Sequence, residues 1–292
     1  MPSFPIVDSH LHFWDPRVLP YPWLEEVPPL NRPFLPADFD QARGPVDVER
    51  IVFIQSETDR ARSLEETEWV SSLAQADPRI AGIVAWAPLE SGEAALENLE
   101  ALAANPMVKG IRRMIHLEPD EDFCILPDFV RGVRLLSRFH WTFDLAVRPA
   151  QMENALSLAR QCPEVRFVLD HAGKPDVRHR IDKPWRDRLK DLSRLPNVWC
   201  KLSGLATEAD GDAWKQEDLK PYIDKTVECF GFDRILFGGD WPVAATGYAR
   251  WVETLQWAVG GCVDGELRRL FRDNAVLFYG MEAPRSGHGS PP

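Results

Sequence analysis

Residues 142–173 read TFDLAVRPAQMENALSLARQCPEVRFVLDHAG and contain two apolar runs on either side of a segment with helical spacing. The stretch begins with a short apolar run (142–147), continues into a segment with helical spacing of apolar residues (149–161), and ends in a second apolar run (166–173). Both runs are nearly continuous rather than alternating, which is typical of parallel strands covered on both faces. The stretch therefore predicts a strand–helix–strand unit of an α/β protein.

The same unit recurs along the whole chain of 292 residues. Apolar runs that end in polar or small residues predict strands within 5–13, 50–57, 80–89, 108–115, 142–147, 166–173, 197–204 and 234–243. Helical patterning covers 63–75, 92–105, 127–139, 149–161, 183–195 and 216–230, with a further helical region at 247–279. This alternation predicts a (β/α)8 TIM barrel. A doubly wound sheet is the weaker alternative, because no glycine-rich phosphate turn follows the first run.

One segment interrupts the alternation. Residues 14–47 are rich in proline and tryptophan, and we expect them to form a long ordered loop over the barrel mouth rather than a linker. The barrel domain is expected to cover residues 1–282. Residues 283–292 have the composition of a disordered tail.

Charge and cysteine content restrict the class of protein. The 45 acidic residues exceed the 34 basic ones and give a formal net charge of −11, which disfavours nucleic acid and anionic lipid as partners. No apolar stretch approaches the roughly 20 residues that span a membrane, and no signal segment begins the sequence, so we expect a cytoplasmic protein. Five scattered cysteines predict free thiols rather than disulfides.

Polar side chains at the ends of the predicted strands are the candidates for chemistry, because the active site of this fold lies there. His10 and His12 are two residues apart on the first strand, so they face the same side. His171 ends the sixth run and Asp240 the eighth. Three imidazoles and one carboxylate suit Zn²⁺ or another divalent metal, whose bound water Asp240 could deprotonate. The alternative is that the histidines are merely polar strand ends.

Arg112 and Arg113 are adjacent on the fourth strand, so only one can point into the barrel. A guanidinium group suits a substrate carboxylate or vicinal hydroxyls, whereas an ion pair on the outer face is the alternative. Further polar residues at strand ends are Asp144, Arg148, Asp170, Lys174, Lys201 and Ser203.

Four more residues are candidates for substrate binding. Gln55 and Glu57 stand where the second strand opens and could bind hydroxyl groups, or could instead cap a helix. Trp14 and Trp241 flank the histidine and aspartate motifs, and their indole faces could stack on a sugar ring. Packing beneath the long first loop is the alternative for both.

Five motifs together resemble a known family. DSHLHFWDP (8–16), KGIRR (109–113), LDHAGKP (169–175), KLSGL (201–205) and RILFGGDWPV (234–243), in this order and spacing, are similar to the amidohydrolase superfamily. The resemblance is to the amidohydrolase 2 group of TIM-barrel metal-dependent hydrolases, and within it to the sugar-lactone and dicarboxylate-lactone hydrolases, such as L-fuconolactonase and L-rhamnonolactonase.

The resemblance implies a catalytic centre of His10, His12, His171 and Asp240 that holds one metal ion, with Zn²⁺ preferred. Lys109 lies near the start of its strand, so a bridging ligand for a second metal is not expected. Some members of the lactonase branch are described as working without metal. In them the histidines polarise the carbonyl and the aspartate activates water, and this alternative stays open.

The implied reaction is hydrolysis of the lactone of a sugar acid, such as L-fucono-, L-galactono- or L-rhamnonolactone, to the free acid. Three other functions stay open: hydrolysis of a dicarboxylate or muconate-type lactone, metal-dependent decarboxylation, and binding of a sugar acid without catalysis. A decarboxylase of this superfamily typically has a histidine on the fifth strand, where this chain has Asp144. A homodimer is an open expectation.

Overall fold

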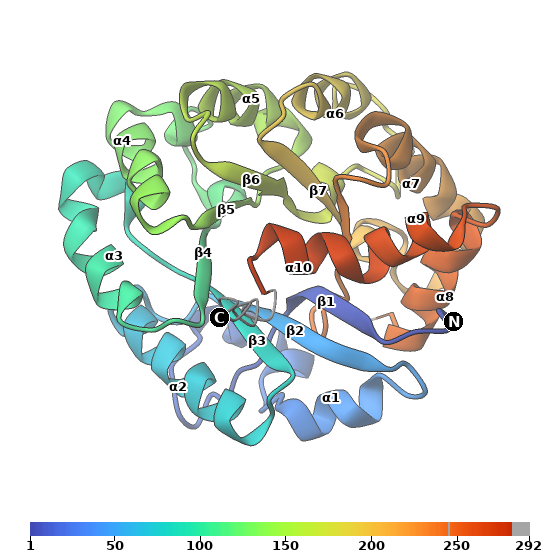
Figure 1. Ribbon diagram of the computed structural model, residues 1–292, viewed down its shortest axis with the longest axis horizontal. Helices are drawn as coiled ribbons and strands as arrows, with labels where there is room; N and C mark the ends of the chain where they lie inside the picture. The colour runs from blue at the N-terminus through green and yellow to red at the C-terminus, as the bar shows by residue number, and fades with distance from the viewer. Residues whose placement is uncertain (245, 282–292) are drawn as a thin grey trace, which may run out of the picture.

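Eight parallel strands pair in sequence order around a barrel in the computed structural model, which describes residues 1–244 and 246–281 (Figure 1). The strands are β1 (Ile6–Leu11), β2 (Val48–Ile54), β3 (Ile80–Ala85), β4 (Val108–Arg113), β5 (Thr142–Leu145), β6 (Arg166–Leu169), β7 (Val198–Leu202) and β8 (Ile235–Phe237). All eight predicted strands are therefore confirmed.

Backbone hydrogen bonds close the barrel between β1 and the segment after β8. The amide of Asp240 donates to the carbonyl of His10 at 2.7 Å, and the amide of His12 donates to the carbonyl of Trp241 at 2.9 Å. The seam of the barrel therefore brings the histidine motif directly beside the aspartate motif.

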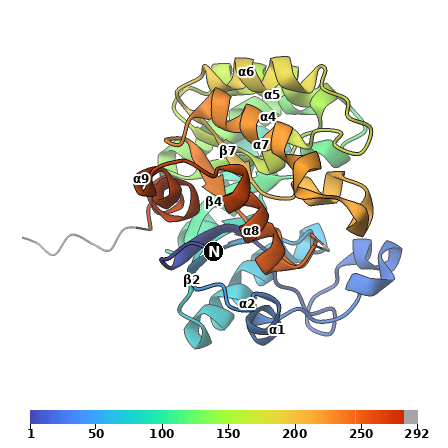
Figure 2. The same cartoon turned by 90° about the vertical axis from the view of Figure 1, so that its right-hand side faces the viewer.

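A ring of helices surrounds the strands, and α10 lies across the end of the barrel nearest the viewer in Figure 1. The helices are α1 (Pro36–Ala42), α2 (Ser63–Ala76), α3 (Leu96–Ala103), α4 (Pro127–Leu135), α5 (Met152–Gln161), α6 (Trp185–Ser193), α7 (Gln216–Phe230), α8 (Tyr248–Ala258), α9 (Asp264–Arg268) and α10 (Asn274–Phe278). Seen from the side, the helices flank the barrel on both sides (Figure 2). The predicted (β/α)8 architecture is confirmed.

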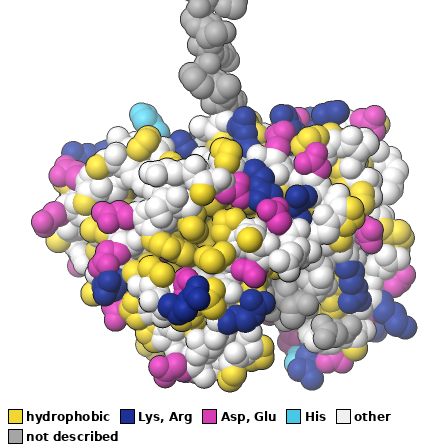
Figure 3. Space-filling view, turned by 90° about the horizontal axis from the view of Figure 1, so that it is seen from below, with side chains coloured by type: hydrophobic (Ala, Val, Ile, Leu, Met, Phe, Trp, Pro, Cys, Tyr) yellow, Lys and Arg dark blue, Asp and Glu magenta, His cyan; other side chains and the backbone are white. Residues whose placement is uncertain are grey.

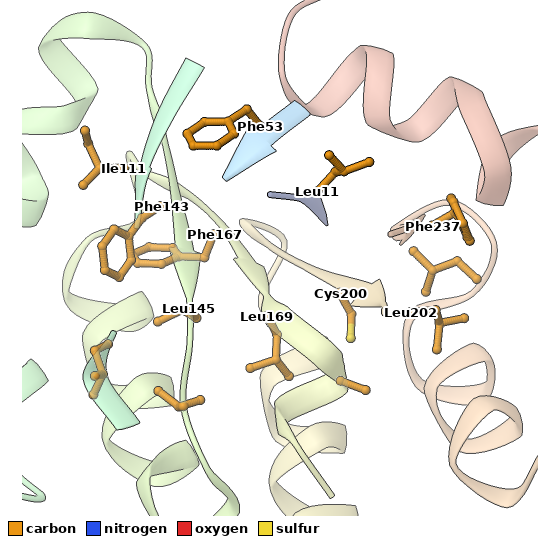
Figure 4. Packing of buried hydrophobic residues seen from close by; sticks show 14 of the residues in the cluster. Leu11, Phe53, Ile111, Phe143, Leu145, Phe167, Leu169, Cys200, Leu202 and Phe237 are labelled. Carbon is orange, nitrogen blue, oxygen red and sulfur yellow. The ribbon is translucent and has the colours of Figure 1, made fainter. Parts of the chain in front are cut away.

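Alternate residues of the strands belong to two separate hydrophobic clusters. The larger cluster packs the outer faces of the strands against the helices, and Figure 4 shows several of its members, among them Phe53, Phe143, Phe167 and Phe237. The smaller cluster joins inward-facing valines and Leu236 to Phe278 at the end of α10. An apolar plug therefore closes one end of the barrel, and the polar residues described below lie toward the other end.

The long segment after β1 packs over the barrel mouth, as predicted. Trp14 and Phe34 exchange backbone hydrogen bonds, and the indole of Trp23 donates to the carbonyl of Ser56 at 2.8 Å. The prediction of a loop throughout residues 14–47 is wrong in one part, because α1 lies within them. A proline at its first position and Asp38, which accepts a hydrogen bond from the amide of Leu35, start this short helix.

The structure also bears on the expectations drawn from charge, hydropathy and cysteine content. On the face seen in Figure 3, acidic and basic side chains are interspersed around a central group of hydrophobic ones. None of the helices in the described part of the chain is long and apolar enough to cross a membrane. The five cysteines are free, three of them buried. The predicted tail, residues 283–292, lies outside the described residues, and the expected homodimer and cytoplasmic location stay predictions.

Candidate active site

His10, near the end of β1, and His12, just after it, are buried, and both turn Nε2 toward Asp240. His12 Nδ1 lies 2.8 Å from the carbonyl oxygen of Ile54, which can only accept, so Nδ1 carries the proton in the neutral ring. Its Nε2 is then unprotonated and carries a lone pair, and it lies 3.6 Å from Asp240 Oδ1. His10 Nε2 also lies 3.6 Å from Asp240 Oδ1.

Asp240 and His171 are held on strained backbone. Both have left-handed φ values, 54° and 53°, which non-glycine residues rarely adopt and which are often found at functional sites. His171 Nδ1 lies 2.9 Å from the hydroxyl of Ser203 and 4.0 Å from Asp240 Oδ2. Asp240 therefore faces His10 and His12 with one oxygen and His171 with the other.

Gly204 makes room for this pair. A Cβ at this position would lie 2.4 Å from His171 Nδ1 and 2.9 Å from Asp240 Oδ2, and the residue has φ +58°. Only glycine satisfies both the close approach and the left-handed backbone. The glycine after β7 is therefore part of the site's construction.

Asp8 supports the site from beneath. Its Oδ1 accepts hydrogen bonds from the amides of His10 and Gly239, and its Oδ2 accepts one from the hydroxyl of Tyr248. Burial raises the pKa of Asp8 to about 6, although these hydrogen bonds act in the opposite direction. One buried carboxyl group thus ties β1 to the turn that carries Asp240.

The electrostatic environment favours neutral imidazoles beside an ionised carboxylate. Burial lowers the pKa of His171 to about 4, and burial likewise lowers the pKa values of His10 and His12. Burial raises the pKa of Asp240, but the neighbouring imidazoles, His171 first, outweigh it and hold the pKa below its ordinary value. At neutral pH the site therefore offers imidazole lone pairs and one carboxylate.

Arg112, and not Arg113, faces the interior. The guanidinium of Arg112 donates to the carbonyl of Gln55 at 2.6 Å, and its NH1 lies 3.2 Å from His10 Nε2. Arg113 instead pairs with Glu90 and Glu118, at 3.0 Å and 2.6 Å. The alternation of β4 thus directs Arg112 into the barrel and Arg113 to the shell outside it.

A cavity of about 640 Å³ opens beside His12. Most of the surface exposed inside it is apolar, although both polar and apolar residues contribute. The lining residues are His12, Trp14, Pro22, Trp23, Ser56, Glu57, Thr58, Asp59, Arg60, Met114, His116, Leu117, Lys174 and Val243. This volume is in the range of small-molecule sites.

The other residues predicted to bind substrate differ in whether they reach the cavity. Glu57 lines the cavity, and its carboxylate accepts a hydrogen bond from the side-chain Nε2 of Gln55, which is itself buried. Trp14 belongs to the wall of the cavity but is fully buried, and its indole nitrogen donates to the carbonyls of two loop residues, Leu30 and Arg32. Trp241 packs among Phe13, Phe34 and Phe39 beneath the first loop and does not line the cavity.

Residues that the sequence analysis left without a role lie beside His10. Asp170 Oδ1 is 3.3 Å from His10 Nδ1, and Lys201 Nζ is 3.2 Å from the same nitrogen. Lys201 also pairs with Asp144 at 2.5 Å. All three are fully buried, in positions that branched aliphatic residues usually fill in such barrels. The sequence did contain an indication of these buried polar groups. Polar residues stand at alternate positions of the fifth run, Thr142 and Asp144, and of the seventh run, Lys201 and Ser203.

The donor atoms fit one divalent cation. The nearest nitrogens of His10 and His12 and a carboxylate oxygen of Asp240 lie within 4.8 Å of one another. Facing lone pairs repel unless a cation or proton lies between them, and neutral imidazole with carboxylate is a donor set that Zn²⁺ accepts. His171 is turned toward Ser203, and the NH1 of Arg112 stands close to His10 Nε2. Two buried sets of three ligand groups in the described part of the chain meet this distance, His10 with His12 and Asp240, and His10 with Asp170 and His171.

Comparison with known proteins gives consistent matches over nearly the whole chain. A family model described as Amidohydrolase matches residues 7–281. The L-fucono-1,5-lactonase of Burkholderia ambifaria is 30% identical over 95% of this chain and 96% of its own length. The L-fucono-1,5-lactonase of Burkholderia multivorans is also 30% identical, over 95% and 97%. A crystal structure of an amidohydrolase from Burkholderia multivorans with bound zinc has a TM-score of 0.84 at 30% identity, covering 95% of this chain and 99% of that one.

Proposed function

The chain belongs to the amidohydrolase family, and we propose that it hydrolyses the lactone of a sugar acid to the free acid. The family resemblance of the five motifs is confirmed. Two relatives named L-fucono-1,5-lactonase support an aldonolactone as the substrate, because each aligns over nearly all of this chain.

The observation that carries the proposal is the placement of Asp240. One carboxylate oxygen faces the Nε2 atoms of His10 and His12, and the other faces His171 across the space kept open by Gly204. The carboxylate is ionised at neutral pH and can accept the proton of a water molecule that attacks the lactone carbonyl. A lactone is an activated ester, so this base needs no covalent nucleophile beside it.

The oxyanion that forms on the lactone carbonyl needs positive charge. Arg112 supplies a guanidinium at the floor of the mouth, held by the Gln55 carbonyl. His10, His12 and Asp240 are the residues that would hold one divalent ion, for which we propose Zn²⁺. When bound, it supplies Lewis acidity to the carbonyl and lowers the pKa of water.

Substrate binding is proposed for the cavity beside His12. Glu57 presents a carboxylate to ring hydroxyls, and the partly exposed indole of Trp23 offers an apolar face. Trp14 is fully buried and supports this face from behind. A position for Trp241 in direct contact with the sugar has no support from the cavity lining.

Decarboxylation is the weaker candidate. At the fifth strand Asp144 is fully buried and engaged by Lys201 and by the hydroxyl of Tyr279, so it offers no ligand to the mouth. Sugar-acid binding without catalysis leaves the strained Asp240 and its converging histidines without a purpose.

The proposal is tested by proton release in a weakly buffered indicator assay across a panel of L- and D-aldonolactones, with the uncatalysed rate subtracted. We expect at least one aldonolactone to be opened, with activity lost after chelation and restored by Zn²⁺. If the lactone is still opened after complete chelation, the proposed lactonase activity stands and the proposed requirement for a metal ion is wrong. No release above the uncatalysed rate with any lactone would contradict the proposal.

A further inference from the structure

Gln55 holds Glu57 by two hydrogen bonds that close a ring. The side-chain Nε2 of Gln55 donates to Glu57 Oε1 at 2.6 Å, and the amide of Glu57 donates to Gln55 Oε1 at 2.7 Å. Gln55 is buried, and Glu57 has a left-handed φ of 55°, a strained conformation that is often found at functional sites. The direction of the Glu57 carboxylate is therefore fixed by its neighbour.

The carboxylate of Glu57 is not neutralised by a basic side chain. The two cations in the wall of the cavity have other partners, because Lys174 pairs with Glu208 at 3.1 Å and Arg60 pairs with Glu118 at 3.2 Å. Glu57 itself forms no ion pair with any residue that the structure describes, although it lines the same cavity. It therefore gives this wall of the cavity an unpaired negative charge.

His116 offers a second hydrogen-bond acceptor to the cavity. Its Nδ1 lies 3.2 Å from the carbonyl oxygen of Ala146, which can only accept, so the neutral ring carries its proton on Nδ1 and its lone pair on Nε2. Burial lowers the pKa of His116 to about 3, which keeps the ring neutral. Two acceptors, from the loops after β2 and β4, therefore line the cavity. Such a wall binds hydroxyl groups, which can donate, and repels carboxylates, which cannot.

Gln55 also joins this wall to the cationic end of the site. Its backbone carbonyl accepts the hydrogen bond from Arg112, while its side chain holds Glu57. A lactone whose carbonyl lies at Arg112 presents its other ring carbons to the cavity that Glu57 lines. The carboxylate that hydrolysis creates forms at the Arg112 end, so the repulsion by Glu57 concerns a carboxylate that the substrate already carries.

We propose that Glu57 determines the charge specificity of the site, with Gln55 as its positioning residue. It selects rings whose substituents are uncharged hydroxyl groups and rejects rings that carry a carboxylate, so lactones of the dicarboxylate or muconate type belong to the rejected class. The kinetic part of this inference rests on the proposed lactone hydrolysis. The preference for an uncharged ring in binding does not.

The kinetic test compares the 1,4-lactone of a hexonic acid with that of the matching hexaric acid, which has a carboxylate in place of the terminal hydroxymethyl group. In the wild-type protein, kcat/KM is expected to be at least about 100-fold higher for the hexonic lactone. Glu57→Gln removes the charge and keeps an acceptor oxygen, and it is expected to reduce this ratio at least about tenfold. Glu93→Gln is the matched control, because Glu93 is exposed and lies outside the cavity, and its ratio is expected to equal that of the wild type.

Gln55→Leu tests the positioning role. It removes both hydrogen bonds to Glu57 at similar side-chain volume and leaves the net charge unchanged, so a fall in the ratio of the two kcat/KM values reports the lost direction of the carboxylate. A purely structural role of Gln55 would lower both kcat/KM values equally, and an unchanged ratio in this variant would overturn its assignment as a positioning residue. If Gln55→Leu does not fold by circular dichroism, the decision rests on Glu57→Gln, whose side chain is only half-buried.

Binding of two unreactive rings separates this inference from the proposed function. Calorimetry is expected to show that the wild-type protein binds a methyl hexopyranoside at least about tenfold more tightly than the corresponding methyl hexopyranosiduronate, and that Glu57→Gln loses this preference. If this preference is found and no lactone is opened, the proposed function fails and the charge selection stands. Equal acceptance of the two lactones by the wild-type protein, or the same ratio in Glu57→Gln, would overturn the inference. Failure to bind either ring, together with failure to open any lactone, would overturn both proposals.

Discussion

His12 Nε2 and Asp240 Oδ1 lie 3.6 Å apart across the seam that closes the barrel. The contact exists because the backbones of β1 and of the segment after β8 bond directly, His12 to Trp241 and Asp240 to His10. The same backbone contacts that close the barrel therefore bring His12 beside Asp240, and we expect substitutions that disturb the seam to disturb the proposed activity.

Exchange of each arginine of β4 should separate catalysis from stability. Arg112→Met is expected to lower kcat by about 10²- to 10³-fold, because it removes a cationic donor beside the developing oxyanion. Arg113→Met is expected to cost roughly 3 kcal/mol in the free energy of unfolding, since Glu90 and Glu118 lose their buried partner, and to leave kcat within about threefold. Steady-state kinetics and urea unfolding of both variants check this, and the reverse pattern would mean that the facing is misassigned.

Substitution of Gly204 should damage the site through its geometry. In Gly204→Ala the new methyl group would lie 2.4 Å from His171 Nδ1, so the imidazole must move. A misplacement of about 1 Å can cost about 10²-fold in kcat. Gly211→Ala is the control, because Gly211 has a similar φ of +50° but nothing within 4 Å of the added carbon. Equal kinetic effects in the two variants would show that backbone strain, and not the clash, is responsible.

Glu66 should make stability depend on pH. It is buried on α2, accepts a hydrogen bond from the amide of Ser56, and burial raises its pKa to about 8. Because the folded pKa lies above the ordinary value, its contribution is fully present below pH 4.5 and is lost as the pH rises through 8. Glu66→Gln avoids this loss, so the variant should match the wild type at pH 4.5 and exceed it above pH 8.

The size of this difference is on the order of 4 kcal/mol, from the 1.36 kcal/mol that each pKa unit represents. Urea unfolding of both proteins from pH 5 to pH 9 measures it. A constant difference between them across this range would contradict a neutral Glu66 in the folded protein.

The strands were predictable because parallel strands covered on both faces leave continuous apolar runs. α1 was not, because its seven residues begin at Pro36 within a proline-rich segment whose composition favours a loop. Alternation along the fourth strand predicted that Arg112 and Arg113 point to opposite sides. It could not tell which of them points inward, because that depends on the pairing with β5, where Arg112 lies opposite Asp144.

The candidate site also has residues that could be predicted from the sequence and residues that could not. His10 lies near the C-terminal end of β1, and His12, His171 and Asp240 come just after strands, so the fold rule alone predicted that they share one end of the barrel. The surroundings of Asp170 could not be predicted, because its neighbours His10, Arg112 and Lys201 come from other strands and meet it only in the folded barrel. Trp241 flanks the aspartate in sequence, yet the packing of the first loop turns it toward Phe39.

The central claim is that Asp240 accepts a proton from the attacking water. The most direct measurement is the rate of proton release by Asp240→Asn with the best aldonolactone of the panel, beside calorimetric binding of the corresponding acid product. We predict a loss of 10²- to 10⁴-fold in kcat, the range for removal of a general base, with product affinity within about threefold of wild type. Turnover by Asp240→Asn at a rate near that of the wild-type protein would contradict the claim.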